Sequence, residues 1–255
     1  MERIAAYRRL GDKSVMPFTI PSGIITTEIS CLESMLDIPE LGIITTKSIG
    51  PRKRAGNREP ILVQYMPGGF INAVGLTNSG AEETAEKLSQ LVLPSNKFLL
   101  ASIFGKDVEE FIFVARTLED CVDGFELNLS CPHAKSYGMQ LGQDPQIVNQ
   151  IIKAVVEAVK RPVFAKLTPN AGNIGEIAKA AMEAGAYGIT AINTVGPGYY
   201  SVDGQPVLTN KVGGLSGIGI KPIGLKCVRE IRQAIGPNAP IIGMGGIVNV
   251  EDVEE

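Results

Sequence analysis

The sequence predicts an α/β fold, and two observations support this prediction. Short apolar runs rich in β-branched residues alternate with longer amphipathic stretches, which is the pattern of βα units around a parallel sheet. Polar or reactive residues follow the end of one predicted strand after another, where a barrel of such units builds its site. An open doubly wound sheet is the alternative, but the second observation favours a (β/α)8 TIM barrel.

The predicted strands and helices alternate along the whole chain. The strands are expected at residues 17–25, 42–49, 97–104, 124–130, 162–169, 188–194 and 240–247. The helices are expected at residues 27–36, 81–91, 108–118, 145–159, 174–184 and 222–235. An eighth βα unit is expected after the last of these strands, and the sequence stops at Glu255. We therefore expect residues 1–255 to form a single barrel domain that lacks its last βα unit.

Composition and charge exclude several classes of function. A length of 255 residues is enough to bury a large core, and a net charge of -3 leaves no broad basic surface for nucleic acid. No apolar run approaches the roughly 18 residues of a membrane span, and no signal peptide is indicated. The four cysteines show no C-x-x-C spacing, which argues against a zinc site or an iron–sulfur cluster held by this chain alone. Free thiols indicate an intracellular, cytoplasmic protein.

The strand expected at residues 124–130 leads into the strongest candidate site. It ends with a carboxamide at Asn128 and a hydroxyl at Ser130, and the thiol of Cys131 comes next. Such a cluster is typical of a strand tip that faces a small polar ligand. A buried structural thiol is the usual interpretation of an isolated cysteine, but these neighbours favour a site.

Lysines and glycines mark the other strand ends. Lys47 and Lys166 lie within apolar strands, where an ammonium group is costly unless it has a negative or polar partner. We expect a bound anion to be that partner. Glycine clusters at residues 213–224 and 241–247 would let a phosphate or a ring edge approach the backbone, although each could be an ordinary tight turn. Neither cluster has the G-x-G-x-x-G spacing of a dinucleotide site.

Seven motifs together carry a family resemblance. They are ITTKSIGPRKRAGN, GGFINAVGLTNSG, FELNLSCPH, FAKLTPN, AINTVGP, GGLSG and IIGMGGI. In this order and spacing, from about residue 17 to residue 247, the chain resembles the class 1 dihydroorotate dehydrogenases. The resemblance implies a flavoprotein oxidoreductase, an FMN-containing barrel that oxidises dihydroorotate to orotate in pyrimidine biosynthesis.

The same resemblance implies a role for individual residues. Cys131 falls at the position of the catalytic base, which takes a proton from C5 of dihydroorotate while C6 delivers hydride to flavin N5. The substrate-binding positions are Lys47, Asn72, Asn128, Asn193 and Thr194. The cofactor-binding positions are Ser22, Lys47, Ser48, Asn128, Lys166, Gly217, Gly245 and Gly246. No metal is expected in this site.

One departure from the family pattern keeps other functions open. The family usually has asparagine two residues after the cysteine, and here that place is His133, the single histidine of the chain. Cys-Pro-His, with FAKLTPN and NTV, also resembles the pyrimidine-reducing barrel of dihydropyrimidine dehydrogenase. The alternative is therefore reduction of uracil or thymine, with Cys131 as general acid. A degenerate flavin-binding barrel without activity is a third hypothesis.

The loop at residues 133–145 bears on the partner. It is closer to the heterotetrameric class, in which a separate subunit with FAD and an iron–sulfur cluster passes electrons to NAD, than to the fumarate-reducing homodimers. We accordingly expect a homodimer or a heterotetramer, with dihydroorotate and orotate as the small-molecule ligands and no nucleic-acid or membrane partner.

Overall fold

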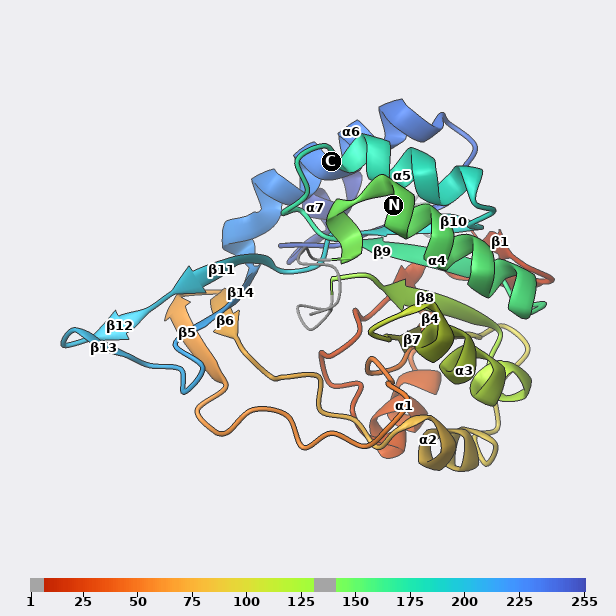
Figure 1. The fold of residues 1–255 in the computed structure, drawn as a ribbon, viewed down its shortest axis with the longest axis horizontal. Coiled ribbons are helices and arrows are strands. Elements are labelled where there is room, and N and C mark those ends of the chain that lie inside the picture. Colours follow the sequence, from red (N-terminus) through yellow and green to blue (C-terminus); the bar gives the residue numbers. More distant parts are fainter. Residues whose placement is uncertain (1–6, 131–140) are drawn as a thin grey trace.

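A single curled parallel sheet organises the protein (Figure 1). The computed structural model describes residues 7–130 and 141–255. The strands are β3 (Phe18–Thr19), β4 (Leu41–Thr45), β7 (Phe98–Ile103), β8 (Gly124–Asn128), β9 (Val163–Leu167), β10 (Gly188–Ala191) and β15 (Ile241–Gly243). Each strand lies beside the next one along the chain, and β3 and β15 form the two edges of this seven-stranded sheet. This arrangement confirms the predicted TIM-barrel-like fold.

Helices cover the outside of the sheet, as βα units require. They are α1 (Ile29–Leu36), α2 (Ala81–Leu88), α3 (Val108–Leu118), α4 (Pro145–Ala158), α5 (Ile174–Glu183), α6 (Lys221–Ile235) and α7 (Val250–Glu254). Side-chain caps set where four of them begin, because Asp107, Asp144, Asn173 and Asn249 accept hydrogen bonds from the first-turn backbone of α3, α4, α5 and α7. Across the described residues, no helix combines the length and the apolar character needed to cross a membrane.

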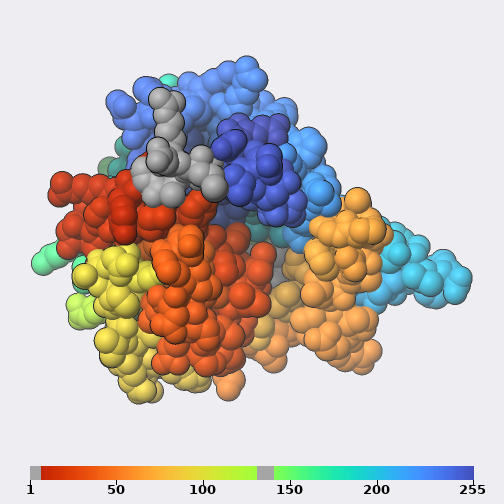
Figure 2. Space-filling model, turned by 180° about the vertical axis from the view of Figure 1, so that it is seen from behind, coloured from red at the N-terminus to blue at the C-terminus, as the bar shows by residue number. Residues whose placement is uncertain are grey.

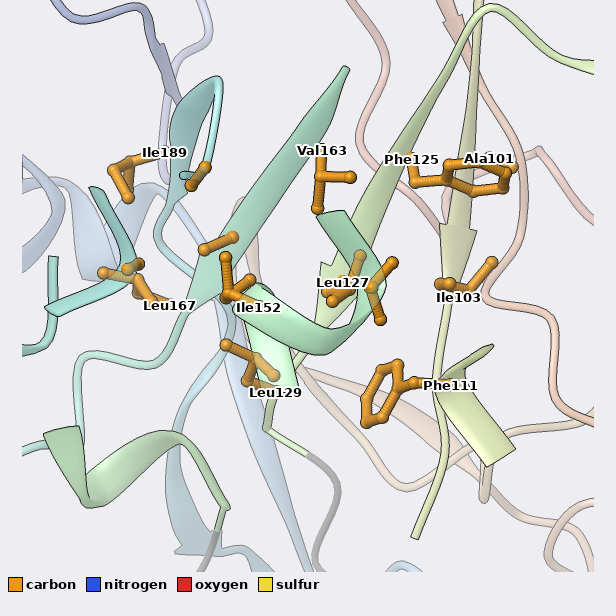
Figure 3. Packing of buried hydrophobic residues seen from close by; sticks show 14 of the residues in the cluster. Ala101, Ile103, Phe111, Phe125, Leu127, Leu129, Ile152, Val163, Leu167 and Ile189 are labelled. Carbon is orange, nitrogen blue, oxygen red and sulfur yellow. The ribbon is translucent and has the colours of Figure 1, made fainter. Parts of the chain in front are cut away.

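Alternation along the strands produces two separate cores. One face of β7 and β8 presents Ala101, Ile103, Phe125 and Leu127 to the helices, and all four are fully buried in the larger cluster (Figure 3). The opposite face points into the barrel. Near the amino-terminal ends of the strands, this interior is filled by a smaller cluster of Leu10, Val15, Ile43, Phe98, Leu100 and Phe164. The hairpin of β1 (Arg8–Leu10) and β2 (Lys13–Val15) thus closes the amino-terminal end of the barrel.

Two insertions form a second sheet that the sequence did not predict. β5 (Leu62–Met66) and β6 (Gly69–Asn72) follow β4, whereas β11 (Val195–Tyr199) and β14 (Val212–Gly217) follow β10. They pair as an antiparallel sheet in the order β11-β14-β6-β5. Between β11 and β14, the small hairpin of β12 (Ser201–Val202) and β13 (Gln205–Pro206) projects away from the body (Figure 1).

The first predicted strand is too long. Residues 17–25 were expected to be extended, but β3 covers only Phe18–Thr19. The chain then turns, because the backbone N–H of Ile24 donates to the carbonyl of Pro21 at 3.2 Å, and Ile25 has φ +46°. This turn brings Ser22 toward the end of β4, which suits a role in the site.

Candidate active site

A cavity of about 2590 Å³ opens at the carboxyl ends of the strands and continues between β3 and β15. Figure 2 shows the face on which the first strands, in red, approach the C-terminal residues, in dark blue, and residues of both segments line the cavity. Every predicted site residue that the structure describes lies on its wall: Ser22, Lys47, Ser48, Asn72, Asn128, Lys166, Asn193, Thr194, Gly217, Gly245 and Gly246. Cys131 and His133 lie outside the described residues, and Ser130, directly before Cys131, lines the cavity.

A chain of hydrogen bonds fixes the amide of Asn128 at the end of β8. Its Nδ2 donates to Ser48 Oγ at 3.2 Å, and its Oδ1 accepts from Asn193 Nδ2 at 3.1 Å. Ser48 shares further hydrogen bonds with Ser22, at 3.2 Å, and with Ser102 on β7, at 2.9 Å. The network holds side chains from four strand ends in one orientation, which is the preorganisation that a polar ligand site requires.

The inserted sheet supplies another wall of the cavity. Asn72 ends β6, and its Nδ2 donates to the carbonyl of Gly214 on β14 at 3.3 Å. The backbone N–H of Thr194 donates to Asn193 Oδ1 at 2.8 Å, and a Cβ on Gly214 would collide with the Thr194 hydroxyl. Glycine at this position therefore lets β14 lie against the predicted substrate residues.

Lys166 has an internal partner, contrary to our expectation that a bound anion would be its partner. Its ammonium lies 3.2 Å from Glu126 Oε1, and the two side chains are 5% and 1% exposed. The carboxylate comes from the neighbouring strand β8 and compensates part of the cost of burying the lysine. The ion pair forms within the barrel, above the apolar cluster that contains Phe164.

Lys47 differs from Lys166 because its ammonium makes no hydrogen bond or ion pair with the described residues. Burial lowers the pKa of Lys47 below its usual value of 10.5, and repulsion from Lys166 lowers it further. A half-buried cation on the cavity wall is therefore available to an anionic ligand. This agrees with the predicted role of Lys47 toward a carboxylate.

Glycines shape the part of the wall near α6. Gly217, Gly245 and Gly246 have φ values of +86°, +124° and +78°, which L side chains rarely adopt. A Cβ on Gly246 would lie 2.7 Å from Cβ of Lys221, so only glycine fits there. Bare backbone, together with a cation that has no partner among the described residues, fits a large anionic ring cofactor such as a flavin nucleotide.

Sequence reasoning gave no role to Ser102 or Glu126. Glu126 lies in the middle of β8, where no strand end draws attention to it, and Ser102 is the next-to-last residue of β7. Alternation along the strand could have identified Glu126, because it lies two residues before Asn128 and therefore faces the same side of β8.

Comparison with known proteins decides the family. The family described as "Dihydroorotate dehydrogenase" matches residues 8–255. The chain belongs to the dihydroorotate dehydrogenase family. Membership confirms the predicted resemblance and the enzyme class, an oxidoreductase of a flavin-dependent family.

Similar proteins from archaea carry one name, "Dihydroorotate dehydrogenase B (NAD(+)), catalytic subunit". The protein from Methanocaldococcus jannaschii is 47% identical over 218 residues, which is 84% of this chain and 70% of the relative. That from Pyrococcus horikoshii is 41% identical over 257 residues, covering 100% of this chain and 82% of the relative. That from Thermoplasma volcanium is 41% identical over 247 residues, covering 96% and 80%.

Proposed function

We propose that this protein oxidises dihydroorotate to orotate in de novo pyrimidine biosynthesis, with FMN as its cofactor. The observation that carries the proposal is the ammonium of Lys47, which has no partner among the described residues and lines the same cavity as the ordered amides of Asn128 and Asn193. Orotate offers a carboxylate to the cation and ring amides to the carboxamides, each of which has a donor and an acceptor. Asn72 and Thr194 complete this set of substrate ligands.

Cys131 is the base in this proposal. It follows directly after Ser130, which lies two residues beyond Asn128, the last residue of β8. With the substrate carboxylate on Lys47 and the ring on the amides, a thiolate at residue 131 would take the C5 proton of dihydroorotate. The fixed amide of Asn128 orients the ring for this transfer.

Three groups of residues would hold the cofactor: the glycine wall, the serine network and the two lysines. The glycine wall is Gly217, Gly245 and Gly246, the serine network is Ser22, Ser48 and Asn128, and the lysines are Lys47 and Lys166. When bound, the flavin supplies the hydride acceptor for C6 of the substrate. Lys166 would stabilise negative charge on the reduced ring. Residues 1–255 then act as one FMN-binding barrel domain, in the cytoplasm.

A ligand titration tests the substrate class. Orotate should perturb the absorbance of the bound flavin at lower concentration than uracil does, because uracil lacks the carboxylate that Lys47 accepts. If uracil bound at least as tightly as orotate, the alternative would replace the proposal: dihydropyrimidine dehydrogenase-type reduction of uracil or thymine, with Cys131 as general acid.

Lys47→Met should weaken orotate binding by roughly 10- to 100-fold, the effect of losing a charge-assisted contact of about 1.5–3 kcal/mol. Uracil binding should change little.

In the parent, orotate affinity should hold below the pKa of Lys47 and fall as pH rises through it. Because that pKa is below 10.5, the fall should begin at lower pH than for an exposed lysine. Flavin-perturbation titrations across pH measure both effects. Lys53→Met, on the exposed loop after β4, is the matched control.

The electron acceptor follows from the class of the relatives. Their shared name, a catalytic subunit of an NAD-linked enzyme, supports a separate partner subunit. Together with the resemblance of residues 133–145 to the heterotetrameric class, it leads us to propose that this partner carries FAD and an iron–sulfur cluster, in a heterotetramer and not a simple homodimer. Such a subunit should copurify with the native protein. Reduction of fumarate by this chain alone at full rate would contradict the heterotetramer.

A further inference from the structure

The described part of the barrel interior contains a buried carboxylate that the proposed reaction does not use. Glu126 lies on β8 and contacts the Lys166 ammonium at 3.2 Å. In the sheet register, Glu126 pairs with Ser102, and Lys166 pairs with Asn128. Paired residues of neighbouring strands share a face. Since Ser102 and Asn128 belong to the cavity network, the ion pair lies inside the barrel directly beneath it.

The charges inside the described part of the barrel do not cancel. Glu126 is the one carboxylate, and Lys47 and Lys166 supply two ammonium groups. The inner-face neighbours on β7 and β10 are the uncharged Ser102 and Thr190, and the Thr190 hydroxyl has no hydrogen-bond partner within the described residues. The two lysines are close enough for Lys166 to depress the pKa of Lys47.

Two ammonium groups in a dry interior repel each other, and each is disfavoured by loss of water. The contact with Glu126 gives the Lys166 ammonium a carboxylate partner and restrains its flexible side chain. Glu126 touches neither the predicted substrate residues nor the glycine wall in any hydrogen bond of the described residues.

We infer that Glu126 is a positioning residue, which holds the ammonium of Lys166 toward the flavin and balances its charge, whether the flavin is oxidised or reduced. This inference rests on the proposed function, because it requires a flavin in the cavity. Glu126 then affects the midpoint potential of the cofactor through Lys166 and makes no direct contact with the substrate.

The test is the pH dependence of the midpoint potential of bound FMN in Glu126→Gln. Glutamine keeps the size of the side chain and removes its charge. Loss of this negative charge should lower the pKa of Lys47 further than burial and Lys166 already do, so Lys47 gives up its proton in the oxidised protein and regains it when reduction adds negative charge to the flavin. The potential of the variant should therefore fall with pH more steeply than that of the parent. One extra proton taken up per two electrons changes the equilibrium constant of reduction tenfold per pH unit, which is a change in potential of about 30 mV per pH unit.

Glu183→Gln is the matched control, because it removes an exposed carboxylate paired with Lys179 on the barrel surface and should leave the slope unchanged. Equal slopes in Glu126→Gln and the parent would overturn the inference. If Glu126→Gln lost flavin, the conservative variant Glu126→Asp, which keeps a carboxylate for Lys166, should retain it. Failure of both variants to bind FMN would show a structural role and overturn the inference. A parent that binds no FMN would instead overturn the proposed function.

Discussion

Replacing Cys131 by alanine should leave the flavin bound and slow its reduction by dihydroorotate by roughly 10²- to 10⁴-fold, the contribution of a positioned base. Binding should survive because the residues proposed to hold FMN lie on the serine network and the glycine wall. Anaerobic stopped-flow absorbance measures the reduction rate, and the flavin content of the purified variant measures binding.

The control for this experiment is another cysteine. Cys31 lies on α1, outside the cavity, so Cys31→Ala should reduce its flavin at the parental rate. If the Cys131 variant also reacted at the parental rate, Cys131 would not be the base. Loss of flavin from the Cys131 variant alone would instead indicate a binding role.

Lys166→Met should destabilise the protein by about 3–5 kcal/mol, because removal of one partner leaves the other charge buried and unpaired. Glu126 is 1% exposed, so water cannot compensate its charge. Denaturant unfolding of the flavin-free protein measures the loss. Lys179→Met, which breaks an exposed pair with Glu183, should change stability little.

Two further variants separate charge from packing. Lys47→Met should raise the stability of the flavin-free protein, because burial already disfavours the charged form of Lys47 and methionine does not carry that cost. Glu126→Gln/Lys166→Met should recover much of the stability lost in Lys166→Met. A Lys166→Met variant as stable as the parent would mean that the ion pair contributes nothing in solution.

Much of the site could be predicted because a parallel sheet with its strands in sequential order brings the carboxyl ends of all the strands to the same side of the barrel. Asn128 and Asn193 lie on different βα units, yet strand order alone predicts that they meet. The resemblance then gave them roles. The glycines at residues 245 and 246 were predictable for a similar reason, since they follow β15.

The other features of the site depend on strand pairing between distant segments, which local sequence patterns do not reveal. The pairing of β6 with β14 joins Asn72 to Gly214 across 142 residues, and neither insertion has the strict alternation of a long strand. The contact of Lys166 with Glu126 depends on the register of β8 against β9, and a shift of one residue would turn one of them outward. Only the structure shows that this lysine already has a carboxylate partner.

The most direct test of the proposed function is anaerobic mixing of the FMN-loaded protein with dihydroorotate while flavin absorbance is followed at roughly 450 nm. Rapid bleaching is the predicted result, and it would establish oxidation of dihydroorotate by this chain. A flavin that stays oxidised with dihydroorotate, but is reoxidised by uracil after reduction with dithionite, would contradict the account and favour a pyrimidine reductase.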